Sequence, residues 1–158
     1  MQKHVPNALV MFAPYVNSYR RLTQAASAPV NNKWGYDNRT TAFRVPRSDP
    51  AGRRVENRIP SSDANPYLAL AASLACGLIG LNRKLKPDAA ITSTANEDEI
   101  DLPRGLLEAV DIFEADQDLR EVLGEPFVST YAAIKRAEFE TFMEVISPWE
   151  REYLLLNV

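Results

Sequence analysis

Cysteine and histidine are almost absent from the sequence, which contains one of each in 158 residues. The single cysteine, Cys76, cannot form a disulfide within the chain, and we interpret it as a small buried residue of a protein from a reducing compartment. We assign no functional role to the single histidine, His4. A signal peptide is not expected either, because Pro6 and Asn7 interrupt the apolar stretch near the N-terminus. The uncharged run 67–81 is shorter than the roughly 20 residues that span a bilayer. We therefore expect a cytoplasmic protein without a membrane partner.

Acidic residues are scarce in the first part of the chain. Residues 1–60 contain three acids and ten basic residues, eight of them arginine, whereas residues 61–158 contain eighteen acids and eight basic residues. A basic segment can bind nucleic acid, but guanidinium is the group that holds a planar oxyanion at two points. The predominance of arginine therefore favours a small anion, and we expect no nucleic-acid partner.

Local patterns predict one α+β domain whose C-terminal half is helical. Residues 33–46 and 54–59 have strand-like composition and flank a turn, which predicts an antiparallel pair. Asn65 and Pro66 are typical of the first positions of a helix, which we expect to end at residue 82. Further helices are predicted over 4–13, 106–113, 119–123 and 127–146, with the apolar residues of the last in the core.

The second predicted strand places one carboxylate between two arginines. Alternate side chains of a strand share a face, so Arg54, Glu56 and Arg58 would point the same way. Two interpretations are possible. The face is either solvated, with a weak surface ion pair, or it belongs to a polyanion site where the arginines hold phosphate or carboxylate and Glu56 holds a cation.

Five segments with matching order and spacing resemble the C-terminal part of the catalytic domain of the glutamine synthetase family. They are "NSYRRL" (17–22), "AP" (28–29), "NRTTAFRVP" (38–46), "RVENRIP" (54–60) and "DANPYLALAASLACGL" (63–78). The resemblance implies antiparallel strands that form part of the catalytic barrel, packed with several helices. It also implies that residues 1–158 are the C-terminal portion of that domain. The N-terminal domain and the first part of the catalytic domain would then be absent, and this chain alone would be inactive.

Members of this family use ATP and Mg²⁺ or Mn²⁺ to join the γ-carboxylate of glutamate to an amine through γ-glutamyl phosphate. By position, the resemblance makes Glu56 a metal ligand and Arg21 the residue that holds the backbone carboxylate of glutamate. Arg58 would contact the glutamate or the transferred phosphoryl group. Arg39 and Arg44 would lie at the ATP phosphates, with Arg39 nearer the group in transfer and also in contact with glutamate. Arg39 and Arg58 are thus the catalytic candidates.

Geometry sets a condition on this assignment. Residues five apart lie on opposite faces of a straight strand, so Arg39 and Arg44 can share a site only if the chain bends, bulges or begins pairing after Arg39. Trp34 and Tyr36 on the same predicted strand either pack internally or offer a stacking face for adenine.

Ser27 occupies the position where glutamine synthetases proper carry a flap glutamate that attracts ammonium. Without that charge, the resemblance implies a wider amine site, closest to the γ-glutamylpolyamine and γ-glutamylputrescine synthetase branches. Two alternatives stay open, namely an ammonia-using glutamine synthetase and a non-catalytic binding or assembly module. Family members form stacked rings, so a homo-oligomer is expected for the full-length protein.

Overall fold

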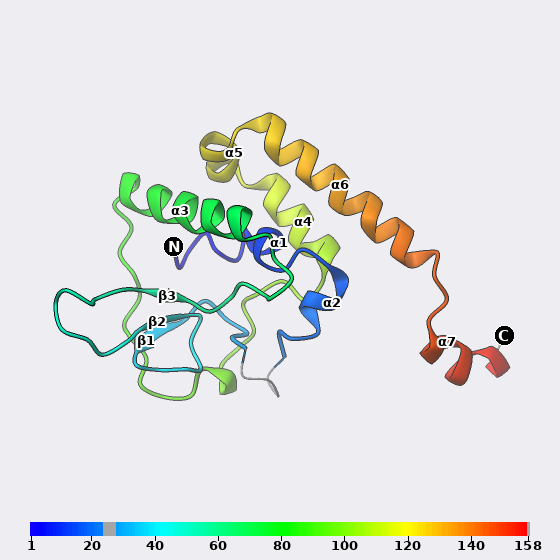
Figure 1. The fold of residues 1–158 in the computed structure, drawn as a ribbon, viewed down its shortest axis with the longest axis horizontal. Helices are drawn as coiled ribbons and strands as arrows, with labels where there is room; N and C mark the ends of the chain where they lie inside the picture. Colours follow the sequence, from blue (N-terminus) through cyan, green and yellow to red (C-terminus); the bar gives the residue numbers. More distant parts are fainter. Residues whose placement is uncertain (24–27, 158) are drawn as a thin grey trace.

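A computed structural model describes residues 1–23 and 28–157 of the chain (Figure 1). A small sheet lies on one side of the long helix α3 (Pro66–Asn82), and the helices α4 (Leu106–Ala115), α5 (Gln117–Leu123) and α6 (Glu125–Met143) lie on the other. The short helix α1 (Leu9–Phe12) contacts both α3 and α4. This is the predicted α+β fold with a helical C-terminal half.

The sheet contains three short strands in the order β1-β2-β3. Strands β2 (Phe43–Val45) and β3 (Glu56–Asn57) form the expected antiparallel pair. Strand β1 (Trp34–Tyr36) lies parallel to β2 on its other side. The sheet is therefore mixed, whereas only antiparallel pairing was predicted.

The single strand predicted over 33–46 is wrong, because a turn over 37–42 separates β1 from β2. Asp37 begins this turn in the left-handed region, with φ of 49°. The side-chain oxygen of Asn38 then accepts the backbone N–H of Thr40 at 2.9 Å. Side-chain bonds of this kind compete with strand pairing, so the local chemistry favours a turn over a continuous strand.

Helix α3 begins and ends as predicted. The Asn65 side chain accepts the backbone N–H groups of Tyr67 and Leu68, and Pro66 is the first helical residue. The inner side of the helix carries small residues that let α1 approach closely. Cys76 on this side is fully buried and free, and its burial raises the pKa of the thiol to about 12.

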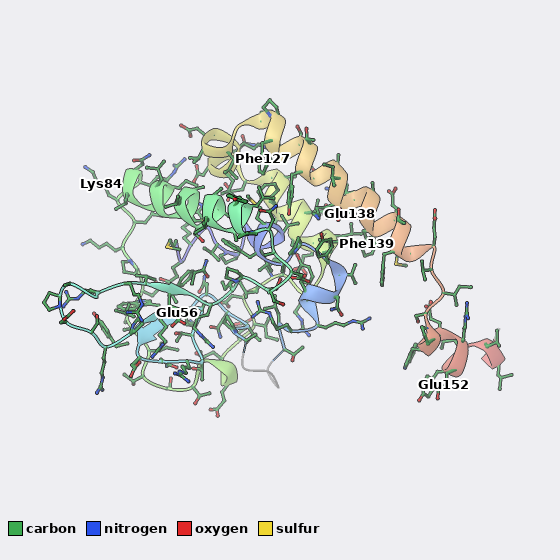
Figure 2. The ribbon with its side chains drawn as sticks, in the orientation of Figure 1. Glu56, Lys84, Phe127, Glu138, Phe139 and Glu152 are labelled. Carbon is green, nitrogen blue, oxygen red and sulfur yellow. The ribbon has the colours of Figure 1, made fainter. Side chains whose placement is uncertain are left out.

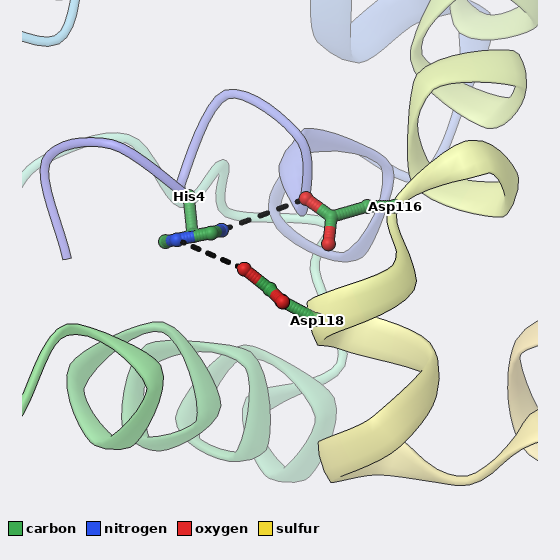
Figure 3. Close-up of side chains that lie close together, drawn as sticks. All are labelled: His4, Asp116 and Asp118. Atoms are coloured by element: carbon green, nitrogen blue, oxygen red, sulfur yellow. Dashed lines mark ion pairs between the residues drawn. The ribbon is translucent and has the colours of Figure 1, made fainter. Parts of the chain in front are cut away.

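His4 joins the N-terminal segment to α5 (Figure 3). Its imidazole lies between two carboxylates, with Nδ1 at 3.5 Å from Asp116 and Nε2 at 3.6 Å from Asp118. Asp116 caps α5 by accepting the Leu119 N–H, and Asp118 pairs with Arg83 just after α3. The two ring nitrogens face different carboxylates, and we call this contact of His4 with Asp116 and Asp118 the His4 staple. The sequence pattern contained no sign of these partners.

The C-terminal helices leave apolar side chains exposed. On α6, Phe127, Tyr131 and Phe139 pack against the core as predicted. Placing the other apolar positions of the 127–146 pattern in the core is wrong, because Ile134, Phe142 and Ile146 are exposed. Helix α6 ends at Met143, and α7 (Pro148–Tyr153) and the 3₁₀ helix η2 (Leu155–Asn157) extend beyond it (Figure 1).

The remaining short elements lie in the connecting segments. Helix α2 (Val16–Tyr19) is the single helical turn that precedes Arg21, and the 3₁₀ helix η1 (Ala95–Glu97) lies in the acidic connector after α3. Across the described residues, no helix combines the length and the apolar character needed to cross a membrane.

Candidate functional site

The register of β2 and β3 places Arg44 directly opposite Glu56. The Arg44 guanidinium spans two carboxylates, with Nη1 at 3.0 Å from Glu56 and Nη2 on Asp37. These two hydrogen bonds raise the pKa of Arg44. Glu56 is exposed and lies on the sheet side of the molecule (Figure 2). Glu56 therefore pairs across the sheet with Arg44 of β2. The binding of a cation by Glu56 and of an anion by the arginines stays a prediction.

Arg58 follows β3 and is half-buried. Its Nη1 donates to the Thr41 carbonyl at 3.0 Å, which ties it to the turn before β2. Burial lowers the pKa of Arg58; Glu56 opposes this, and the charges of Arg44 and Arg39 lower the pKa further. Arg58, Arg44, Arg39 and Glu56 are therefore electrostatic neighbours, although the chain brings them from a turn and two strands.

Arg21 reaches the same region from the turn after α2. Its Nη2 donates to the carbonyl of Ile59, the residue next to Arg58. Burial lowers the pKa of Arg21, the nearby Asp63 carboxylate opposes this, and the charge of Arg58 lowers it again. Arg21 and Arg58 are thus adjacent cations held at the end of β3.

Arg39 lies in the 37–42 turn and its side chain is exposed. Strand pairing begins at Phe43, after Arg39, which is one of the three geometries that would let Arg39 and Arg44 share a site. The charge of Arg39 acts on Arg58, whose pKa burial and neighbouring cations lower. Ser27, the expected amine-site residue, lies outside the described residues.

Two carboxylates near these arginines were not singled out from the sequence. Asp37 forms an ion pair with Arg44. Asp63 accepts hydrogen bonds from the hydroxyl groups of Ser18, at 2.9 Å, and of Ser61. A signal for Asp37 exists in hindsight, because Asp37 and Asn38 are residue types that favour a turn, although the composition of residues 33–46 predicts a strand there. Asp63 had no comparable signal, since its partner Ser18 is 45 residues away.

The two aromatic residues of β1, Trp34 and Tyr36, differ in their surroundings. Trp34 packs against the core and donates from Nε1 to the Asp88 carbonyl at 2.7 Å, so packing is correct for this ring. Its neighbour Tyr36 meets it edge-on at 5.4 Å between ring centroids and is exposed. Stacking of a base on Tyr36 stays an untested prediction.

The arrangement suits a polyanion better than a cation alone. Four arginines, Arg21, Arg39, Arg44 and Arg58, lie in this region with three carboxylates, Asp37, Glu56 and Asp63, so the cluster carries excess positive charge. Two buried Nε atoms, on Arg21 and Arg44, have no hydrogen-bond partner among the described residues. Such donors fit oxyanion acceptors. Glu56 and Asp37 offer the oxygen ligands that a hard divalent ion prefers, and they fit such an ion as part of a larger ligand set.

Comparison with known proteins gives a consistent result over almost the whole chain. The family model described as "Glutamine synthetase, catalytic domain" matches residues 1–154. Glutamate–isopropylamine ligase of a Pseudomonas species is 40% identical over 144 residues, which are 89% of this chain and 31% of the relative. Gamma-glutamylputrescine synthetase PuuA of Escherichia coli K12 is 37% identical over 154 residues, 97% of this chain and 33% of the relative. Glutamine synthetase of Pyrococcus abyssi is 40% identical over 153 residues, 91% of this chain and 35% of the relative.

Solved structures match equally well. Apo GmaS superposes with a TM-score of 0.83 at 34% identity, covering 98% of this chain and 36% of GmaS. A GmaS/ADP complex gives 0.82 at the same identity, covering 98% of this chain and 37% of that one. The chain therefore spans about a third of the length of the relatives that it matches.

Proposed function

Because the chain belongs to the family of the glutamine synthetase catalytic domain, we propose that it supplies half of the active site of an ATP-dependent glutamate–amine ligase. The reaction phosphorylates the γ-carboxylate of glutamate, and an amine then displaces the phosphate. The observation that carries this proposal is a chain of neighbouring arginines: Arg44 pairs with Glu56, and Arg58 feels the charges of Glu56, Arg44 and Arg39. Arg21 joins them by donating to the carbonyl of Ile59, the residue next to Arg58. Transfer of a phosphoryl group requires fixed positive charge around its oxygens, and a set of arginines provides it.

Each residue has a role in this proposal. Arg21 binds the backbone carboxylate of glutamate, using donors that include its buried Nε. Arg58 and Arg39 stabilise charge on the γ-carboxylate and on the phosphoryl group, so these two are the catalytic residues. Arg44 binds the ATP phosphates. Glu56 is the residue of this cluster that would hold a Mg²⁺ or Mn²⁺ ion, which when bound supplies positive charge between nucleotide and glutamate.

The acceptor is proposed to be an amine larger than ammonia. Two of the relatives are named for isopropylamine and putrescine, and Ser27 provides no negative charge to attract a small cation. Ammonia is the alternative acceptor, and the similarity to the Pyrococcus abyssi glutamine synthetase supports it. A Ser27→Glu substitution separates the two, since it should raise kcat/KM for ammonia relative to putrescine if an open amine site is present.

The remainder of the active site is proposed to come from sequence beyond this chain and from neighbouring subunits of a homo-oligomer. Apolar side chains exposed on α3 and beyond the end of α6 support this view, because large apolar areas on a protein surface mark interaction sites. The isolated chain is expected to be inactive.

The test uses a completed enzyme, in which this chain replaces the matching region of the Escherichia coli γ-glutamylputrescine synthetase. We expect glutamate- and ATP-dependent phosphate release with putrescine, isopropylamine or ammonia, and none from the isolated chain. Arg39→Ala should lower kcat by about 100-fold or more, as expected when a charge on the transition state is removed. Arg47→Ala, a change of an exposed arginine in the turn after β2, should have little effect.

Two results would contradict the proposal. One is a folded, assembled completed enzyme that shows no turnover with any of the three amines. The other is equal activity of the Arg39→Ala and Arg47→Ala variants, which would mean that the arginine cluster does not serve catalysis. In the second case a non-catalytic binding or assembly role for this region becomes the better explanation.

A further inference from the structure

Asp63 lies between β3 and α3, and each of its carboxylate oxygens accepts a hydrogen bond from a serine hydroxyl group. The buried Ser18 of α2 donates to Oδ2 at 2.9 Å, and Ser61 donates to Oδ1. The backbone N–H of Ser61 donates at 2.9 Å to the carbonyl of Phe12, the last residue of α1. The carboxylate thus ties α2 to the segment that leaves β3, where that segment meets α1.

Arg21 spans the same two segments. It stands three residues after Ser18, and its Nη2 donates to the carbonyl of Ile59, two residues before Ser61. The position of its guanidinium group therefore depends on how α2 sits against the segment after β3. Asp63 fixes that relation.

Charge gives Asp63 a second effect on Arg21. Arg58 is a neighbouring cation that repels Arg21, and the Asp63 carboxylate offsets this repulsion. Because both Asp63 oxygens accept from hydroxyl groups, the carboxylate acts on Arg21 through its field. The Nε of Arg21 is buried and has no hydrogen-bond partner among the described residues, so it is a donor that lacks an acceptor.

We infer that Asp63 is a positioning residue, whose bonds to Ser18 and Ser61 hold Arg21 in the place where it binds the backbone carboxylate of glutamate. The inference rests on the proposed function. Asp63 does not touch the substrate and acts only through Arg21. Its loss should therefore weaken glutamate binding and leave phosphoryl transfer from bound substrate largely intact.

The kinetic test compares Asp63→Asn with the unchanged completed enzyme. We expect KM for glutamate to rise about tenfold, kcat to change less than about threefold, and KM for ATP to stay the same. Asp63→Glu should recover part of the affinity because it restores the charge. Asp49→Asn is the matched control, since Asp49 lies in an exposed turn and accepts the Gly52 N–H at 2.8 Å. It should leave KM for glutamate unchanged.

A second measurement uses the 158-residue chain itself. The Nε–H resonance of Arg21, assigned by its loss in Arg21→Lys, should shift or broaden in Asp63→Asn and not in Asp49→Asn. An unchanged resonance, an unchanged KM for glutamate, or a parallel loss of kcat and of affinity for every substrate would each overturn the inference while the proposed function stands. Absence of turnover in the unsubstituted completed enzyme would overturn both.

Discussion

At the scale of single residues, Arg44 divides its guanidinium group between Glu56 and Asp37. If Glu56 takes a divalent cation in the assembled site, its bond to Arg44 has to weaken, because the cation and the guanidinium compete for the same carboxylate. Asp37 then keeps one arm of Arg44 in place. The arginine is in this way held near the site in either state.

The first prediction concerns Glu56→Gln, which keeps the shape of the side chain and removes its charge. The urea midpoint of the isolated chain should change little, because exposed ion pairs contribute little to stability. In the completed enzyme, kcat should fall about 100-fold or more, because an amide oxygen is a poor replacement for an anionic metal ligand. Asp49→Asn is the control: it removes the charge of an exposed carboxylate that accepts the Gly52 N–H, and it should retain most of the turnover. Full activity of Glu56→Gln would exclude Glu56 as a metal ligand.

The arginines of the candidate site were found from the sequence because the motifs that contain them are short and continuous. The carboxylates that orient them were missed for a physical reason. Asp63 has its partner Ser18 at a separation of 45 residues, and only the packing of α2 against the segment after β3 brings them together. No local pattern records such a contact.

At the scale of secondary-structure elements, local chemistry decided what could be predicted. The start of α3 follows from Asn65 and Pro66, which act on the backbone within one turn. The division of the predicted strand over 33–46 depends on distant contacts as well. The backbone N–H of Ile91 donates to the Trp34 carbonyl at 2.9 Å, which fixes β1 from a segment far along the chain. Strand boundaries set in this way cannot be read from composition.

The His4 staple connects the N-terminal segment with α5 (Figure 3). Asp116, whose side chain is less exposed than that of Asp118, also caps α5. Burial raises the pKa of Asp116, but hydrogen bonds from Asn7 and from the Leu119 N–H, together with His4, hold it below its usual value. Asp118 and Arg83 complete the charged surroundings.

The second prediction is a loss of stability in acid that depends on Asp116. Because the folded-state pKa is lowered, the unfolded chain binds more protons near pH 4, so the contribution is present above the unfolded pKa and disappears as pH falls through the folded one. The free energy of unfolding in urea, measured from pH 7 to pH 2.5, should therefore fall less steeply in Asp116→Asn than in the unsubstituted chain.

Asp63 adds a second contribution, since its pKa is also lowered: burial opposes the shift, and bonds from Ser61 and Ser18 produce it. Part of the acid dependence should therefore persist in Asp116→Asn and be smaller in the double variant with Asp63→Asn. Asp49→Asn serves as the control for charge. Identical slopes in Asp116→Asn and the unsubstituted chain would show that the staple contributes nothing to the acid dependence.

At the scale of the whole molecule, α3 is apolar on its outer side as well as its inner side. Tyr67, Leu70, Leu74, Leu78 and Leu81 recur at helical spacing and are all exposed. A helix that is apolar all round is normally buried all round. The outer side of α3 is therefore a continuous apolar surface that burial against another surface would stabilise.

The third prediction is that the outer face of α3 makes the isolated chain associate with itself. Leu70 and Leu74 are 64% and 72% exposed, and apolar area of this kind gains free energy when it leaves water. Sedimentation velocity at rising concentration should show species larger than the 17.7 kDa monomer.

Leu70→Lys combined with Leu74→Glu should shift the distribution to monomer, with helix content by circular dichroism unchanged because both new residues favour helix. Thr130→Lys with Thr141→Glu on exposed positions of α6 introduces the same charges and should leave association intact. A chain that stays monomeric at every concentration, or a control that dissociates it equally, would show that the outer face of α3 drives no association.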